Sequence, residues 1–278
     1  MATFATSDQL LVIIDPAARQ TDGEAVRIAK DVLSAGAAAK VCLPEGPEEF
    51  ARALGRRGSR RPVVIGDGAA LVRAVTLLHR QRELAGCALS VVPVGDTALA
   101  ESLGVPGGAV AAARAVLDGI EHRLDLLVDD SDGVVLGRLG IPPVRAADAE
   151  PVPAIPGRTW YRSLVRTLAA SRPVRLPGVP APCAARLRVE VDGQTVIGLD
   201  QPVEGVSVTA GTDGVASVEV RPLSVGAEAT PLLAAGRTVT VTGADFRYRA
   251  DTAVSGPVRR RTWRVAEGAW GLVLPADR

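Results

Sequence analysis

Hydrophobic and polar positions in the first half of the chain form short apolar runs that alternate with amphipathic segments. Leu10–Ile14 is a compact apolar run that ends at Asp15-Pro16, which predicts a buried strand followed by a turn. Gly23–Gly36 places apolar side chains at offsets of three, four and seven, which predicts an amphipathic helix. Similar patterns predict strands at 38–43, 62–65, 89–93 and 124–128, and helices at 48–54, 69–79 and 110–120. This regular succession favours parallel βαβ units.

The second half of the chain has a different pattern. Residues 141–157 contain five prolines, which indicates a linker or an irregular loop, and residues 160–170 predict one helix. Short β-rich runs follow, with turn signals at Asp192-Gly193 and Asp213-Gly214. A spacing of about ten residues per strand is typical of a β-sandwich or barrel. The runs lie at 185–191, 195–199, 205–210, 216–221, 237–242, 245–248, 262–265 and 270–274.

The two patterns together predict an α/β protein of two domains. The first is a Rossmann-like, three-layer domain around a parallel sheet at residues 1–137, and the second is a β-sandwich domain at residues 138–278. For the last predicted strand, a place in the first domain is left open as an alternative. A length of 278 residues with 47% hydrophobic residues is enough for two domains and a sizeable core.

Composition narrows the range of partners and compartments. A formal net charge of +1 removes the electrostatic argument for nucleic acid as the main partner. Cys42, Cys87 and Cys183 are widely spaced without a CxxC pair, so we expect a reducing cytoplasm and neither a disulfide framework nor a zinc site. The apolar run near the start is too short for a signal peptide, and no segment reaches the roughly 18 apolar residues of a membrane span.

The tripeptide Gly66-Asp67-Gly68 joins a predicted buried strand to a predicted helix. In this position backbone N–H groups and the helix N-terminus can bind an anion, and glycines let a phosphate approach the backbone closely. Asp67 is suited to position a metal ion or a phosphate chain. The same residues also fit a tight strand-to-helix turn without any ligand, and on this segment alone that interpretation is favoured.

Several segments, taken in order, resemble the lipid kinases of the diacylglycerol-kinase family. That family has an Asn-Pro turn, a Gly-Gly-Asp-Gly-Thr loop and a Pro-x-Gly-Thr-Gly-Asn-Asp loop, the last leading into a helix that ends Leu-Gly-Ile-Pro. Further similarities lie at Asp125 in a predicted strand, at residues 211–220 and at residues 248–253, so the resemblance spans about residues 10 to 275. The counterparts of the four motifs are Asp15-Pro16, Ile65-Gly66-Asp67-Gly68-Ala69, the run from Pro93 to Ala100, and Leu103-Gly104-Val105-Pro106.

The resemblance implies a nucleotide-binding first domain, with ATP and a lipid acceptor such as diacylglycerol meeting in the cleft between the domains. Mg²⁺ would neutralise the charge that develops on the phosphoryl group. Asp251 would be the general base, Asp213 a metal ligand in the second domain, and Asp125 part of a supporting charge network. The implied cofactor-binding residues are Asp15, Gly66, Asp67, Gly68, Gly95 and Thr97.

The chain also departs from the family pattern at its chemically important positions. An aspartate, Asp15, replaces the amide before proline, and Ala69 replaces the loop threonine and offers no hydroxyl. The second loop is one residue short and lacks its Asn-Asp pair, and Thr252-Ala253 replace Gly-Glu after Asp251. A catalytically inactive relative that acts as a binding or regulatory module is therefore the alternative. An NAD kinase ranks last, because no second acidic motif suits a nicotinamide ribose.

The remaining candidates have simpler interpretations. Arginines cluster at 56–61 and 259–261, where they could attract ATP phosphates or anionic lipid headgroups, although solvated surface is favoured for both clusters. His79 and His122 resemble no metal site or triad, and Asp129, Asp130 and Asp132 suit a polar hairpin tip better than a calcium loop. A small-molecule or lipid substrate is expected. Peripheral contact with a membrane and a homodimer are both compatible with the sequence.

Overall fold

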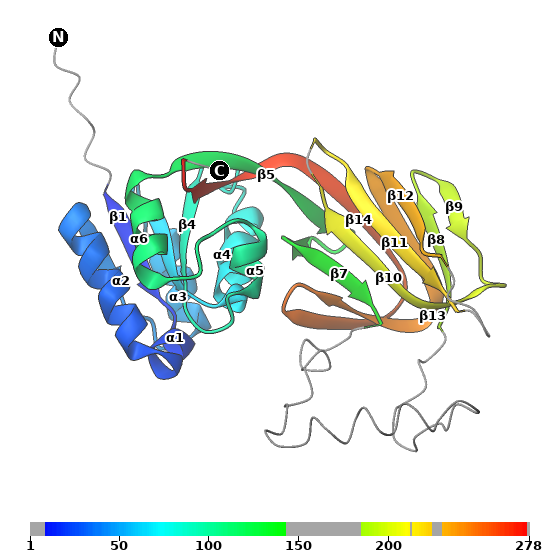
Figure 1. Ribbon diagram of the computed structural model, residues 1–278, viewed down its shortest axis with the longest axis horizontal. Coiled ribbons are helices and arrows are strands. Elements are labelled where there is room, and N and C mark those ends of the chain that lie inside the picture. The colour runs from blue at the N-terminus through cyan, green and yellow to red at the C-terminus, as the bar shows by residue number, and fades with distance from the viewer. Residues whose placement is uncertain (1–8, 143–184, 212, 224–229, 277–278) are drawn as a thin grey trace, which may run out of the picture.

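The computed structural model describes residues 9–142, 185–211, 213–223 and 230–276, and Figure 1 shows an α/β half beside a strand-rich half. The predicted helix at 160–170 and the predicted linker beyond residue 142 lie outside the described residues, as does Cys183. Within these ranges, no helix has the length and apolar character needed to cross a membrane.

The sheet of the α/β half is parallel over four strands in the order β2-β1-β3-β4. Beyond β4 it becomes mixed, because β14 (Ala253–Leu274) adds in parallel to β4 and β5 (Ile120–Asp129) pairs antiparallel with β14. The α/β class is as predicted, whereas the purely parallel sheet holds only for the first four strands. Their bounds are β1 Leu10–Ile14, β2 Ala39–Cys42, β3 Arg61–Gly66 and β4 Ala88–Pro93.

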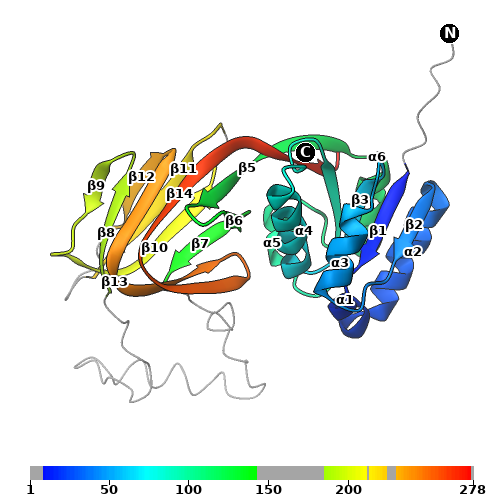
Figure 2. The same cartoon turned by 180° about the vertical axis from the view of Figure 1, so that it is seen from behind.

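Helices cover both faces of this sheet, with α2 and α6 on one side and α3 and α4 on the other (Figures 1 and 2). Helix α2 occupies the predicted range and is capped by Asp22, whose side chain accepts a hydrogen bond of 2.9 Å from the Ala25 N–H. Strands β1, β3 and β4 are continuous apolar runs because both of their faces are covered. The helices are α1 Pro16–Thr21, α2 Gly23–Gly36, α3 Pro47–Gly55, α4 Gly68–Arg80, α5 Ala98–Ser102 and α6 Ala109–Asp118.

The strand-rich half has two antiparallel layers around a common apolar core. One layer has the order β12-β11-β10-β7 and ends at the second part of β13. The other has the order β9-β8, the first part of β13, β14, β5 and β6, and β8 also pairs with β10 of the first layer. Strand β13 therefore passes from one layer to the other. The bounds are β6 Val134–Val135, β7 Arg138–Ile141, β8 Ala185–Val191, β9 Gln194–Ile197, β10 Pro202–Ala210, β11 Ala216–Pro222, β12 Leu232–Gly236 and β13 Thr238–Ala250.

Two predicted strand pairs are single long strands in the structure. The runs at 237–242 and 245–248 form β13, and those at 262–265 and 270–274 form part of β14. The polar interruptions that suggested loops are instead irregularities in the pairing, between Thr242 and Phe246 and between Ala266 and Trp270. The predicted turns at Asp192-Gly193 and Asp213-Gly214 are confirmed, since all four residues have positive φ.

Strands β5 and β14 run through both halves and contribute to both apolar cores. On β5, Leu126 packs into the core of the α/β half and Leu127 into the core of the strand-rich half. On β14, Trp270 packs into the core of the α/β half and Trp263 into the core of the strand-rich half. The domain boundary between residues 137 and 138 stays a prediction, because these two strands join the halves into one hydrogen-bonded unit.

Substitution of Gly119 tests how closely the end of β14 packs against the α/β half. A side-chain carbon at Gly119 would collide with the backbone oxygens of Ala115 and Leu274, so we expect Gly119→Ala to lower the free energy of unfolding by about 1–3 kcal/mol. Gly86→Ala is the matched control, because its new methyl group enters open space, and it should change stability by less than about 0.5 kcal/mol. Urea denaturation measures both; equal stability of the two variants would contradict this packing.

Candidate functional site

The carboxyl ends of β1, β3 and β4 bring the predicted cofactor-binding residues to one edge of the sheet. Asp15 follows β1, and its N–H donates to the Ile65 carbonyl of β3 at 2.9 Å. The Gly66 carbonyl at the end of β3 accepts from Val94 at 3.0 Å. A side-chain carbon at Gly95 would lie 3.7 Å from Cβ of Asp67. The structure thus places these residues next to one another, and their role in binding a cofactor stays a prediction.

The N-terminus of α4 uses its hydrogen-bond donors within the protein. The Asp67 side chain caps the helix by accepting from the Ala70 N–H at 2.9 Å, and its carbonyl accepts from Leu71 at 3.2 Å. The Gly68 N–H donates to the Asp96 carbonyl at 3.3 Å. A phosphate bound at this helix end would have to replace the bonds of the Gly68 and Ala70 N–H groups, whereas the Ala69 N–H has no partner among the described residues.

The two glycines of the loop allow protein atoms to pack closely. A side-chain carbon at Gly66 would lie 2.7 Å from Cβ of Ala70 and 3.1 Å from Cβ of Asp15. One at Gly68 would lie 3.1 Å from Cβ of Leu99 and 3.2 Å from Cγ2 of Thr252. Helix packing and the contact with the second half therefore explain both glycines without a phosphate.

Asp15 forms an ion pair that the sequence did not indicate. Its Oδ2 lies 2.6 Å from Nη1 of Arg73 on α4, while Oδ1 accepts from the Ala17 N–H at 2.9 Å and caps α1. The Arg73 guanidinium also lies over the Phe50 ring, 5.5 Å from its centroid. The pair spans 58 positions in the sequence, so no local pattern could have revealed it. Arg73 neutralises the negative charge that replaces the family's amide.

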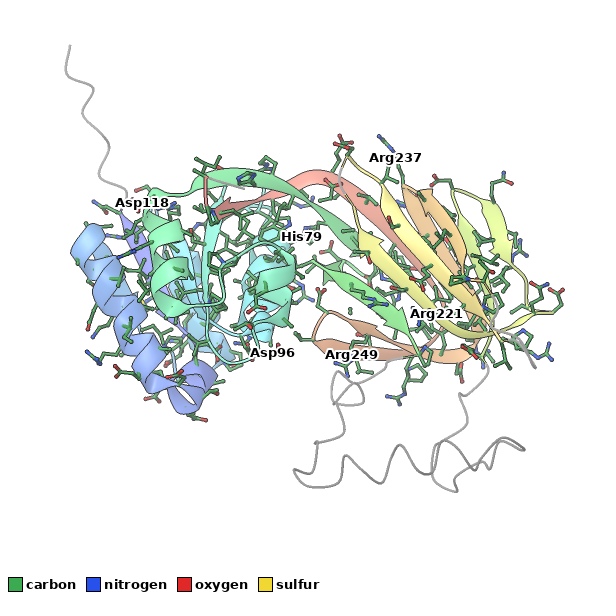
Figure 3. The ribbon with its side chains drawn as sticks, in the orientation of Figure 1. His79, Asp96, Asp118, Arg221, Arg237 and Arg249 are labelled. Carbon is green, nitrogen blue, oxygen red and sulfur yellow. The ribbon has the colours of Figure 1, made fainter. Side chains whose placement is uncertain are left out.

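The second loop is also satisfied internally. Gly95 has φ +94°, which explains the glycine, and Asp96 Oδ1 accepts from the Ala98 N–H at 3.1 Å before α5. The Thr97 hydroxyl donates to Glu101 Oε1 at 2.7 Å. Asp96 lies at the edge of the α/β half that faces the strand-rich half, across from Arg249 (Figure 3). The polar side chains of this loop therefore hold the start of α5.

Asp251 occupies the turn between β13 and β14 in the left-handed conformation, with φ +49°. Its carboxylate accepts three consecutive backbone N–H groups, from Leu136 at 2.7 Å, Gly137 at 2.8 Å and Arg138 at 3.0 Å. Its own N–H donates to the Arg138 carbonyl at 2.8 Å. Burial raises the pKa of this carboxyl above its ordinary value of 3.8, and the three N–H groups offset only part of the rise.

The side chains of Leu99 and Thr252 lie next to Gly68 of the loop, and Leu99 also lies next to Gly137, close to Asp251. Leu99 touches the Gly68 position on one side, and a carbon at Gly137 would lie 2.8 Å from its Cδ1 and 3.3 Å from Asp251 Oδ1. The loop and the carboxylate are thus on the same side of the molecule, with apolar atoms between them. Two hollows in the described part of the chain lie elsewhere, at β10–β12 (about 430 Å³) and at β2 and α3 (about 240 Å³).

The fold has counterparts among solved structures. "A putative diacylglycerol kinase from Bacillus anthracis str. Sterne" superimposes with a TM-score of 0.71 at 15% identity, over 97% of this chain and 98% of the other. A second structure with that description gives 0.70 at 14%, and one titled as a diacylglycerol kinase from the same organism gives 0.68 at 12%, with the same coverage. The chain has the diacylglycerol-kinase fold. No family model matches the sequence, and neither does any curated protein.

Within the diacylglycerol-kinase fold, Asp125 and Asp213 form part of the framework. The buried Asp125 carboxylate accepts from the N–H groups of Gly214 at 2.7 Å and Gly268 at 2.8 Å, and so ties the β10–β11 turn to β14. Asp213 is an exposed turn residue with φ +65°. Among the described residues, no group of three or more His, Cys, Asp or Glu side chains is placed to hold a metal ion. The metal role of Asp213 stays a prediction.

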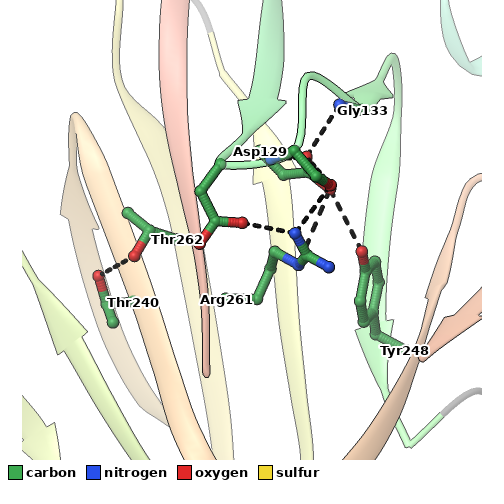
Figure 4. A network of polar contacts seen from close by, with 8 residues as sticks. Asp129, Gly133, Thr240, Tyr248, Arg261 and Thr262 are labelled. Atoms are coloured by element: carbon green, nitrogen blue, oxygen red, sulfur yellow. Dashed lines mark hydrogen bonds and ion pairs between the residues drawn. The ribbon is translucent and has the colours of Figure 1, made fainter. Parts of the chain in front are cut away.

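The acidic run at 129–132 is the turn of the β5–β6 hairpin, which agrees with a hairpin tip. The Asp129 carboxylate accepts from the N–H groups of Ser131 and Gly133, each at 2.8 Å, and from the Tyr248 hydroxyl at 3.3 Å, with Arg261 4.0 Å away (Figure 4). Burial alone would raise the pKa of Asp129, but the hydrogen bonds from Gly133 and Ser131, together with the positive charge of Arg261, outweigh it and hold the pKa below 3.8. The carboxylate links the hairpin to β13 and β14.

A double-mutant cycle on Asp15 and Arg73 tests the internal ion pair. Arg73→Met leaves a buried carboxylate without its partner, and we expect a loss of about 2–3 kcal/mol, below the roughly 3–5 kcal/mol of a fully buried pair because Arg73 is partly exposed. In an Asp15→Asn background the same substitution should cost much less, because asparagine keeps the α1 cap without the charge. Chemical denaturation measures the coupling, and additive effects would contradict it.

The pH dependence of stability tests the burial of Asp251. Because its pKa is raised in the folded protein, the folded state holds a proton that the unfolded state has released, so stability falls as pH rises above 3.8 through the folded pKa. Asp251→Asn should remove this component, which begins above the ordinary pKa of 3.8 and extends through the raised folded pKa. Asp213→Asn, at an exposed turn of similar conformation, is the control and should keep the wild-type slope. An unchanged slope in Asp251→Asn would rule out the proposed cause.

Proposed function

We propose that the chain is a catalytically inactive relative of the diacylglycerol kinases that acts as a binding or regulatory module. One observation carries the proposal: Leu99 and Thr252 pack against Gly68, between the Gly-Asp-Gly loop and Asp251. Phosphoryl transfer depends on an acceptor hydroxyl placed in line with the transferred phosphoryl group and beside a base. In this arrangement the space for the reacting groups is taken by side chains.

The hydrogen bonds of Asp251 support the same conclusion. A general base must approach the acceptor hydroxyl to within about 2.6–3.2 Å and accept its proton. Both oxygens of Asp251 already accept backbone N–H groups, and one of them accepts two. If the carboxylate rotated toward an acceptor, the partly buried N–H groups of Leu136 and Gly137 would lose their partner, at about 1–3 kcal/mol for each buried donor left unsatisfied, while the exposed Arg138 N–H could bond to water.

The residues of the loop do not fit Mg·ATP. A triphosphate needs free N–H donors and positive charge. Here Gly68 N–H is bonded to Asp96, and Asp15 adds a negative charge whose nearby cation, Arg73, is already paired. Ala69 has no hydroxyl to contribute. These features match the departures that the sequence shows from the family motifs.

ATP-dependent phosphoryl transfer to the hydroxyl of a lipid such as diacylglycerol is the second candidate. It is favoured by the position of Asp251, which lies on the same side of the molecule as the loop and has a raised pKa, as general bases often do. This function requires Leu99 and Thr252 to separate from Gly68 when substrates bind, as in a closing and opening of the two halves.

A phosphoryl-transfer assay separates the two candidates. With labelled ATP, Mg²⁺ and diacylglycerol in mixed micelles, we expect no lipid phosphate above background, and the same result for Asp251→Asn. An active diacylglycerol kinase in the same micelles is the positive control, and a wider panel of lipid alcohols extends the test. Turnover by the wild-type protein that Asp251→Asn abolishes would establish the kinase function and refute the inactive one.

A further inference from the structure

The arginine cluster at 56–61 is not a uniform solvated surface. Arg57 forms an ion pair with a glutamate, and Arg60 and Arg61 donate to backbone carbonyls. Arg56 differs, because its guanidinium has no hydrogen bond or ion pair within the part of the chain that the structure describes. It follows the C-terminus of α3 and lines the hollow beside β2. Three of the four arginines thus have structural roles, and one remains available to a ligand.

The hollow collects positive charge from separate elements. Lys40 on β2 is one of only two lysines in the sequence, and in the described ranges its ammonium group also has no partner. The charge of Arg52 is offset by Glu49 at 3.6 Å, so Lys40 and Arg56 supply the uncompensated charge. The volume is about 240 Å³, and the lining consists of Leu11, Lys40, Cys42, Glu49, Arg52, Ala53 and Arg56.

The two unpaired cations and the small volume of the hollow favour a small anionic ligand. Two uncompensated cations around one concavity create a positive potential that attracts anions. A guanidinium matches phosphate oxygens in a two-pronged geometry, and an ammonium adds a point charge. The partly exposed Ala53 adds a small apolar surface beside the two cations. The volume is below the roughly 300–1,000 Å³ of pockets for drug-sized ligands, so a nucleoside triphosphate is too large.

We infer that the hollow between β2 and α3 binds a small phosphate-bearing anion, either inorganic phosphate or a short phosphate monoester. None of its lining residues belongs to the Gly-Asp-Gly loop or to the turn at Asp251. The inference is therefore independent of the proposed function, and its outcome does not depend on ATP or a lipid. Lys40 and Arg56 would hold this anion whether or not the protein is an active kinase.

Cys42 provides a built-in reporter of binding, because its thiol is partly exposed in the lining of the hollow. The experiment measures alkylation of this cysteine by the neutral reagent iodoacetamide, with the modified peptide quantified by mass spectrometry. Inorganic phosphate or glycerol 3-phosphate is added, with chloride at equal ionic strength as the control. A bound anion should protect the thiol, with a rate reduction of about tenfold at ten times the dissociation constant. Alkylation of the buried Cys87 should stay slow throughout.

Lys40→Met and Arg56→Gln should each abolish the protection, and because both side chains are exposed the variants should keep the wild-type thermal unfolding. Arg260→Gln removes an exposed arginine of β14 without a partner among the described residues, and it should leave the protection unchanged. Protection by both anions would indicate phosphate itself, and protection by glycerol 3-phosphate alone would indicate a monoester. The inference is overturned if chloride protects equally, if neither anion protects, or if Lys40→Met and Arg56→Gln retain full protection.

Discussion

The contact between the Asp251 carboxylate and three consecutive backbone N–H groups determines how the two halves of the molecule meet. The carboxylate holds the turn of the β13–β14 hairpin against residues 136–138, where the chain crosses from β6 to β7. With the turn fixed there, Thr252 lies against Gly68 and Leu99 lies beside Gly137. Burial strengthens each of these hydrogen bonds, since water does not compete effectively for the carboxylate. The residue that the family resemblance makes a base therefore anchors a backbone turn, and its catalytic role stays a prediction.

Other aspartates of the resemblance have similar roles. Asp67 caps α4, Asp15 caps α1 and pairs with Arg73, and Asp125 binds two backbone N–H groups. The carbonyl of Asp125 also accepts from Trp270 Nε1 at 3.3 Å, which fixes β14 where it enters the α/β half. Acidic side chains that would coordinate metal or phosphate in an enzyme here satisfy donors of the protein itself. Each of these carboxylates stabilises a turn or a helix end, and this contribution to the fold does not depend on catalysis.

The sequence predicted the elements that depend on local pattern. Strand β1, helix α2 and the turns at Asp192 and Asp213 were predictable, because burial on both faces, helical periodicity and positive-φ turn residues leave clear signals. The long strands β13 and β14 were not, since their irregular pairings resemble loops, and β12 was missed because its Leu-Leu-Ala-Ala-Gly run lacks β-branched residues.

The site was only partly predictable. The order of the motifs grouped Asp15, Gly66 and Gly95 as residues of one site, and the structure places all three at one edge of the sheet. The sequence could not show that Arg73 pairs with Asp15, or that the backbone of residues 136–138 occupies the Asp251 carboxylate. Both depend on tertiary contacts between distant segments, and backbone N–H groups carry no residue-specific signal. Whether these side chains are available to substrates depends on such contacts.

Under the proposed inactive function, the protein's own atoms occupy the place of a nucleotide and its acceptor. A crystal structure from crystals soaked with Mg²⁺ and a non-hydrolysable ATP analogue tests this claim most directly. We expect no nucleotide density at residues 66–68, with the Gly68 N–H still bonded to the Asp96 carbonyl near 3.3 Å and Thr252 still against Gly68. A triphosphate bound at the N-terminus of α4, with Leu99 and Thr252 displaced and Asp251 facing the γ-phosphate, would contradict it.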